Sequence, residues 1–231
     1  MRYGVTICNH GDFAHPGLLR DLGVAAEEAG WDGVFLWDHV ARRHQPPMTD
    51  PWIALAAIAT VTDRVILGPM VTPLPRRRPW KLARETVALD HLSGGRLVLG
   101  VGIGVRPEEF DHLGEETDPR ARAALLDDGL DLVTGLWRGE PVAHRGPAGD
   151  VTAWFRPGPV QQPRIPHLGG RPVAVEAADA AGRPLGRCLP HRSRRPAHPG
   201  RRGRHRRLPG RPPGCGLRAD GAGDRGPDHA R

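Results

Sequence analysis

The sequence predicts an α/β protein built on a parallel sheet. Short apolar segments with strand character lie at residues 3–8, 33–37, 65–71 and 97–102, and a segment with helical spacing follows each of them. Strands that alternate with helices in this way predict right-handed crossovers between parallel strands. Two layouts fit the order, an open doubly wound sheet and a (β/α)₈ barrel, and the pattern alone does not choose between them.

The first three elements are predicted within residues 3–37. Residues 3–8 (YGVTIC) alternate and include β-branched side chains, which is typical of a strand. Residues 16–29 place leucine and alanine on one helical face, and Gly30 follows where a C-terminal cap is expected. Residues 33–37 (GVFLW) are continuously apolar, which predicts a strand buried on both faces.

The later helices carry recognisable start and stop signals. Two of them begin with an aspartate followed by a proline, because the carboxylate caps free backbone N–H groups and proline suits the first helical position. A Ser-Gly-Gly sequence ends another. The three helices are predicted over residues 50–62, 79–92 and 118–137.

Composition changes near residue 166. Residues 1–166 hold all six Trp, all four Phe and the single Tyr, with 18 basic and 21 acidic side chains. Residues 167–231 hold 15 Arg, no Lys, 5 acidic residues, and 21 Gly and Pro in 65 positions. The net charge of +7 therefore comes from the tail, which has too few large apolar side chains to offset its ordering entropy. We expect the folded domain to occupy residues 1–166 and residues 167–231 to be a disordered tail with no domain.

Cysteine spacing and hydropathy exclude several classes. Cys8 is the only cysteine before residue 167, and no CxxC pair occurs, so we expect neither a disulfide framework nor a metal site. The N-terminus lacks a basic segment followed by an apolar run, and no stretch approaches the roughly 18 apolar residues of a membrane span. These features predict a cytoplasmic protein without a membrane partner.

Asp38 and His39 are the sharpest candidate site residues. They directly follow the second predicted strand, and both possible layouts place functional groups at the carboxyl ends of parallel strands. An imidazole beside a carboxylate can donate or accept a proton near neutral pH. The alternative interpretation is a loop histidine next to an aspartate that caps its own turn.

Three other segments carry weaker signals. Gly100-x-Gly102-x-Gly104 follows a strand, but Val105 replaces the last glycine of a dinucleotide fingerprint, so a tight turn or close approach to a cofactor is the better interpretation. The arginines of residues 76–78 could contact a phosphate or could form a solvated loop. The acids of residues 107–110 could supply an active-site acid or could begin a short helix.

The body of the chain resembles the luciferase-like flavin-dependent oxidoreductases, a superfamily that includes enzymes dependent on coenzyme F420. The stretches AAEEAGWDGVFLWDHV (25–40), SGGRLVLGVG (93–102), EEF (108–110) and RPGPVQQPRIP (156–166) carry the resemblance, together with most of residues 50–104. The resemblance implies a TIM-type (β/α)₈ barrel, of which this chain holds the N-terminal half and one further segment. It also implies FMN or coenzyme F420 as cofactor, a small-molecule substrate and a homodimer.

The resemblance also assigns site residues. It implies that Asp38 and His39 are catalytic, since F420-binding members carry an Asp-His pair after the second strand. Val71 and Thr72 match the bulge that faces the isoalloxazine ring, and Gly102 and Gly104 match the turn beside it. Val105 stands where sugar-phosphate dehydrogenases of this class carry a glutamate, so that proton donor is missing.

After residue 166 the resemblance stops. Family members continue with segments like IWVGGRWP and RWDGVFPI, and both emerge when permissible codons for the tail are read one base later. We therefore expect residues 167–231 to be the product of a frameshift in the codons for residues 165–167. The predicted function is a flavin- or F420-dependent oxidoreductase or monooxygenase, impaired in this chain. The alternatives are an inactive barrel fragment and nucleic-acid binding through the basic tail, and we do not expect the latter because the tail lacks lysine and aromatic side chains.

Overall fold

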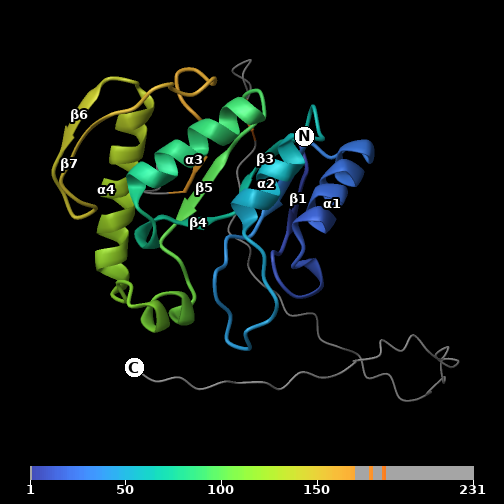
Figure 1. Ribbon diagram of the computed structural model, residues 1–231, viewed down its shortest axis with the longest axis horizontal. Coiled ribbons are helices and arrows are strands. Elements are labelled where there is room, and N and C mark those ends of the chain that lie inside the picture. Colours follow the sequence, from blue (N-terminus) through green and yellow to red (C-terminus); the bar gives the residue numbers. More distant parts are fainter. Residues whose placement is uncertain (1, 170–176, 179–183, 186–231) are drawn as a thin grey trace, which may run out of the picture. The chain divides into compact units, whose positions relative to one another are not determined.

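The computed structural model describes residues 2–169, 177–178 and 184–185. Within this part, helices and parallel strands alternate as expected (Figure 1). The strands are β1 (Gly4–Ile7), β2 (Gly33–Leu36), β3 (Ile66–Pro69), β4 (Thr72–Pro73), β5 (Leu99–Gly102) and β8 (His167–Leu168). The helices are α1 (Pro16–Glu28), α2 (Pro51–Ala59), α3 (Pro79–Leu92) and α4 (Pro119–Trp137).

The parallel strands form two sheets that meet between β3 and β5. The first has the order β1-β2-β3 and the second the order β4-β5-β8. Leu67 of β3 joins them, since its N–H donates to the Arg96 carbonyl at 3.0 Å and its carbonyl accepts from the Val98 N–H at 2.9 Å. In the described residues β1 and β8 each pair on one side only, so the strands do not close into a barrel.

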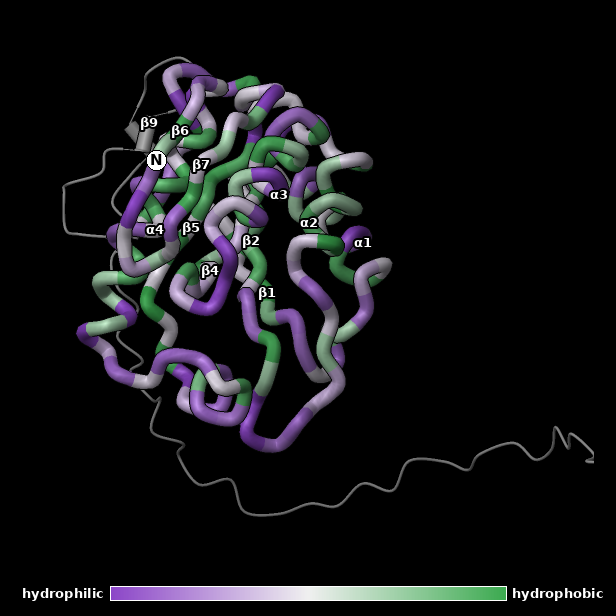
Figure 2. The backbone as a smooth tube through the Cα atoms, turned by 60° about the vertical axis from the view of Figure 1, so that its left-hand side comes forward, coloured by the Kyte–Doolittle hydropathy of each residue, from purple (hydrophilic) through white to green (hydrophobic). Residues whose placement is uncertain are grey.

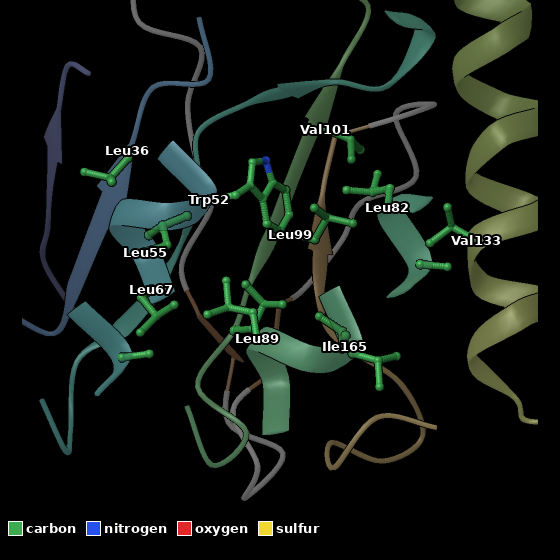
Figure 3. Packing of buried hydrophobic residues seen from close by; sticks show 14 of the residues in the cluster. Leu36, Trp52, Leu55, Leu67, Leu82, Leu89, Leu99, Val101, Val133 and Ile165 are labelled. Atoms are coloured by element: carbon green, nitrogen blue, oxygen red, sulfur yellow. The ribbon is translucent and has the colours of Figure 1, made fainter. Parts of the chain in front are cut away.

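The core lies between these strands and the helices. Leucines from β2, β3 and β5 meet Trp52 and Leu55 of α2, Leu82 and Leu89 of α3 and Val133 of α4 (Figure 3). Figure 2 shows β2 and β5 as mainly hydrophobic tube, whereas much of the loop chain is hydrophilic. This pattern agrees with strands covered by helices, whose burial removes apolar surface from water.

The predicted caps are confirmed. The Asp50 carboxylate accepts a hydrogen bond from the Ile53 N–H, and the Asp118 carboxylate accepts one from the Ala121 N–H, each at 2.9 Å. Gly30 follows α1 with a φ of 82°, a left-handed conformation that glycine adopts at little cost. The acids after β5 do begin a short helical turn, the 3₁₀ segment Pro107–Glu109.

The elements differ from the expectation at two places. The single strand expected over residues 65–71 is wrong at its end, because β3 stops at Pro69 and β4 restarts at Thr72 after a cis peptide bond between Met70 and Val71. An antiparallel hairpin that was not expected, β6 (Pro141–His144) with β7 (Val151–Trp154), follows α4. Strand β8, directly after residue 166, pairs with β5 in parallel.

The remainder of the predicted tail lies almost entirely outside the described residues. Two short strands, β9 (Ala177–Ala178) and β10 (Pro184–Leu185), pair with each other. No helix in the described part of the chain is both long and apolar enough to span a lipid bilayer.

Candidate functional site

A pocket of about 290 Å³ opens where the carboxyl ends of β2, β3 and β5 meet. Five of the six predicted site residues line it, although they come from segments far apart in the sequence. They are Asp38, His39, Val71, Gly102 and Gly104. The structure therefore places Asp38 and His39, expected from their position at a strand end, beside the three residues that the family resemblance implied.

The sixth predicted residue, Thr72, lies beneath the pocket rather than in its wall. Its side chain is fully buried, and its hydroxyl donates to Oδ2 of Asp38 at 2.7 Å. Thr72 therefore belongs to the site through Asp38.

Asp38 is buried and its carboxylate is saturated with donors. Trp52 Nε1–H donates to Oδ2 at 3.1 Å, in addition to the Thr72 hydroxyl. Arg77 donates to both oxygens at 3.0 and 2.8 Å, and Arg76 donates to Oδ1 at 3.1 Å. Burial opposes ionisation, but the two guanidinium groups and the hydrogen bonds outweigh it and hold the pKa of Asp38 below its ordinary value.

The arginine run after β4 is directed inward, which neither interpretation of the sequence anticipated. The Arg76 side chain is 6% exposed and that of Arg77 is 17% exposed, so these two are not a solvated loop. Each of them donates to the Asp38 carboxylate through Nη2. One feature of the sequence could have indicated this pairing. Asp38 and the two arginines each follow a strand, and the ends of neighbouring strands lie close together.

His39 is held by a buried glutamate, Glu109. His39 Nδ1 lies 2.9 Å from Glu109 Oε1, and the same oxygen accepts from the Val40 N–H at 2.9 Å. Glu109 is 1% exposed. Burial raises its pKa, but the bonds from His39 and Val40 and the charge of Arg76 outweigh burial and lower it overall.

His10, which no pattern in the sequence singles out, lies next to two residues of the pocket wall. Its ring lies 5.9 Å from Trp37 and 6.4 Å from His39, and Trp37 meets His39 edge-on at 5.7 Å. Burial lowers the pKa of His10, and the charges of Arg42, His39 and Arg106 add to this effect. The available signal was its position shortly after the first strand, at the same edge of the sheet as His39.

The two predicted glycines are required by packing within the chain. A Cβ on Gly102 would lie 3.0 Å from Val71, and a Cβ on Gly104 would collide with the Phe110 ring. Gly104 also has a φ of 77°. Small residues at the end of β5 therefore leave room for Val71, which lines the pocket, and for the Phe110 ring.

The pocket fits the ring of a flavin or deazaflavin in size and chemistry. Its volume is at the lower limit of about 300 Å³ for small-molecule sites, enough for a ring system but not for a whole nucleotide. The aliphatic side chains of Met70, Val71 and Ile103 supply an apolar wall, and His39 supplies a polar edge. Val105, where the resemblance implies a glutamate, is 78% exposed at the rim.

A match to a known protein family covers most of the chain. Residues 1–192 match the family model described as luciferase-like monooxygenase. The chain belongs to this family. No group of three His, Cys, Asp or Glu side chains in the described residues is placed to hold a metal ion.

Similar proteins include a dehydrogenase and a monooxygenase. An F420-dependent glucose-6-phosphate dehydrogenase of Nakamurella multipartita is 40% identical over 136 residues, which cover 57% of this chain and 40% of the relative. A 4-hydroxyprotoasukamycin monooxygenase of Streptomyces nodosus subsp. asukaensis is 34% identical over 166 residues, covering 70% of this chain and 42% of the relative. This chain therefore spans about two fifths of the length of these curated relatives.

This chain also matches only part of a solved structure. The monooxygenase RslO1 from Streptomyces bottropensis superimposes with a TM-score of 0.65 at 29% identity, covering 73% of this chain and 53% of that chain. The alternating strands and helices described above are thus those of a luciferase-like fold, represented here by part of a barrel.

Proposed function

We propose that the pocket is the ring-facing part of an FMN or F420 site and that the protein is an oxidoreductase or monooxygenase of the luciferase-like class. The observation that carries the proposal is the meeting of His39, the Met70–Val71 break and the Gly102–Gly104 turn around one apolar pocket. The F420 dependence named for the Nakamurella relative supports F420, and the oxygenating relative keeps FMN as the alternative. The substrate is a small molecule.

In this proposal the cofactor supplies the hydride or oxygen chemistry, and the chain supplies orientation and proton transfer. His39 is the group that exchanges a proton with substrate, because its Nε2 meets only the Arg42 guanidinium, at 3.4 Å, among the described contacts. Asp38 is predicted to act as a positioning residue, since its carboxylate is occupied by four side chains. It holds Trp52, Thr72 and the arginines beneath the pocket.

Catalysis by His39 can be tested with an alcohol substrate and F420. Because the function is predicted to be impaired in this chain, we expect the full chain to bleach the visible absorbance of F420 slowly in the presence of glucose 6-phosphate or another alcohol. A His39→Gln variant should lose about 100-fold or more of this rate, the usual contribution of a general base. His44→Gln, an exposed loop histidine, is the matched control and should keep the rate.

A second candidate function is that of an inactive barrel fragment. It is favoured by the open edges of β1 and β8 in the described residues, since a completed barrel would pair both. Cofactor binding without turnover, with wild type and His39→Gln indistinguishable, would support the fragment and contradict the catalytic proposal. Homodimer formation belongs to the catalytic proposal and follows from the family resemblance alone.

We also propose that residues 1–166 are the N-terminal part of the barrel and that residues 167–231 are a frameshifted reading. Composition and the reappearance of family segments in the next frame support this. Resequencing the gene across the codons for residues 164–168 tests it. Loss of one base would restore a longer barrel, whereas an unchanged reading would contradict the frameshift.

A further inference from the structure

Glu109 reaches the pocket from a segment that follows β5, seventy residues along the chain from His39. Its short helical turn, Pro107–Glu109, is anchored by Phe110, whose ring is 1% exposed and packs beneath Gly104. One carboxylate oxygen, Oε1, accepts from His39 Nδ1 and from the backbone N–H groups of Val40 and Ala41, the last at 3.5 Å. Glu109 therefore holds residues 39–41, which follow β2, through hydrogen bonds to one oxygen.

We infer that Glu109 is a positioning residue that keeps the His39 proton on Nδ1 and so leaves Nε2 as the proton-accepting nitrogen of the site. The inference rests on the proposed function for the role of Nε2. An ionised carboxylate can only accept hydrogen bonds, so the hydrogen between Glu109 and His39 must belong to the imidazole. The lowered pKa of Glu109 keeps it ionised near neutral pH.

The groups on the other side of the ring favour the same tautomer. Arg42 Nη1 lies 3.4 Å from Nε2, and a guanidinium can only donate, so it matches a nitrogen that carries a lone pair. His10 and Trp37 pack against the ring and restrict its rotation. A ring held in this way presents one nitrogen to a reacting group, as in sites where a second residue fixes the tautomer of a histidine.

Glu109 is held at one carboxylate oxygen. Its Oε1 receives hydrogen bonds from His39 and from the N–H groups of Val40 and Ala41, and its side chain is 1% exposed. Its contribution to the reaction therefore acts through His39.

Nitrogen-15 NMR of the histidine-labelled full chain tests the inference without cofactor or substrate. We expect His39 in the wild type to carry its proton on Nδ1. In Glu109→Ala the preference for this tautomer should fall by about tenfold or more, because the charged acceptor is lost. Glu109→Gln keeps a carbonyl acceptor and should restore the preference, and Glu108→Ala, the neighbouring acid, should not change it.

A wild-type His39 protonated on Nε2 would overturn the inference. This measurement does not depend on whether any variant folds. An unchanged tautomer in folded Glu109→Ala protein would also overturn it. Because the readout is the ring itself, the positioning role can fail while cofactor binding succeeds, and the converse also holds.

Discussion

The two ends of the parallel sheet use charged side chains in different ways. At the amino end, Glu27 accepts hydrogen bonds from the backbone of Asp63, Arg64 and Val65, which lead into β3. Arg96 donates to the carbonyls of Ala59, Thr62 and Val65 in the same turn. Both charged side chains therefore form hydrogen bonds with the backbone that joins α2 to β3.

At the carboxyl end the charged groups bind other side chains as well as backbone. Asp38 pairs with Arg76 and Arg77, and Glu109 pairs with His39. His39 Nε2 then meets only Arg42 among the described contacts, and Arg106 lines the pocket. The difference shows that the amino end fixes only the course of the chain, whereas the carboxyl end also fixes the side chains that would meet a ligand.

The largest effect is expected at Asp38. Asp38→Asn should reduce the free energy of unfolding by about 3–5 kcal/mol, because it leaves two buried guanidinium groups without their counter-charge. Denaturant unfolding measures the loss, and Asp21→Asn, in the exposed pair with Arg20, should change stability by less than about 1 kcal/mol. Equal small effects for the two variants would contradict the buried ion-pair network.

Arg96→Met should cost about 2–4 kcal/mol, because several half-buried carbonyls lose a charged donor. Arg64→Met is the control, since Arg64 is exposed and its guanidinium bonds only one carbonyl among the described contacts, that of Glu27. The same denaturant titration compares them. If Arg96→Met were as stable as Arg64→Met, the amino end would not depend on this residue.

His167 tests whether β8 belongs to the folded unit. Burial, with the nearby charge of Arg164, lowers its pKa to about 4 from an ordinary 6.5. The unfolded chain therefore binds the extra proton between these values, and stability should fall as pH falls from 6.5 towards 4, by up to about 1.4 kcal/mol per pH unit. His167→Phe should remove this component and exposed His112→Phe should keep it; identical pH profiles for wild type and His167→Phe would contradict burial in β8.

The smallest effect is expected at Glu27. Burial raises its pKa, but the backbone bonds from Val65, Asp63 and Arg64 outweigh burial and hold the pKa below the ordinary 4.5. Its contribution is thus present above 4.5 and lost as pH falls through the lower folded value. Glu27→Gln should cost about 1 kcal/mol at neutral pH and reduce the acid sensitivity, while exposed Glu28→Gln should do neither. Acid titration of unfolding measures both.

Much of the fold followed from local signals, whereas the partners of the site residues did not. The caps at Asp50 and Asp118 and the strand end at Asp38 act over a few residues, so a single sequence reveals them. The pairing of His39 with Glu109 joins two strand ends through the curvature of the sheet. No spacing in the sequence encodes that distance.

Two other features of the structure did not follow from the pattern of residues, for similar reasons. The break at Met70–Val71 lies in an apolar run that looks continuous, because hydropathy does not report backbone geometry. Arg76 and Arg77 looked like solvated charges, because the buried acid that binds them lies 38 and 39 residues earlier.

Titration of the full chain with FMN and with F420, followed by tryptophan fluorescence, tests the central claim most directly. The pocket at the carboxyl ends of the strands is predicted to bind at least one of the two cofactors saturably. Trp37, in the pocket wall, should report the binding through a change in its fluorescence. A protein that unfolds cooperatively but shows no saturable binding of either cofactor would contradict the account.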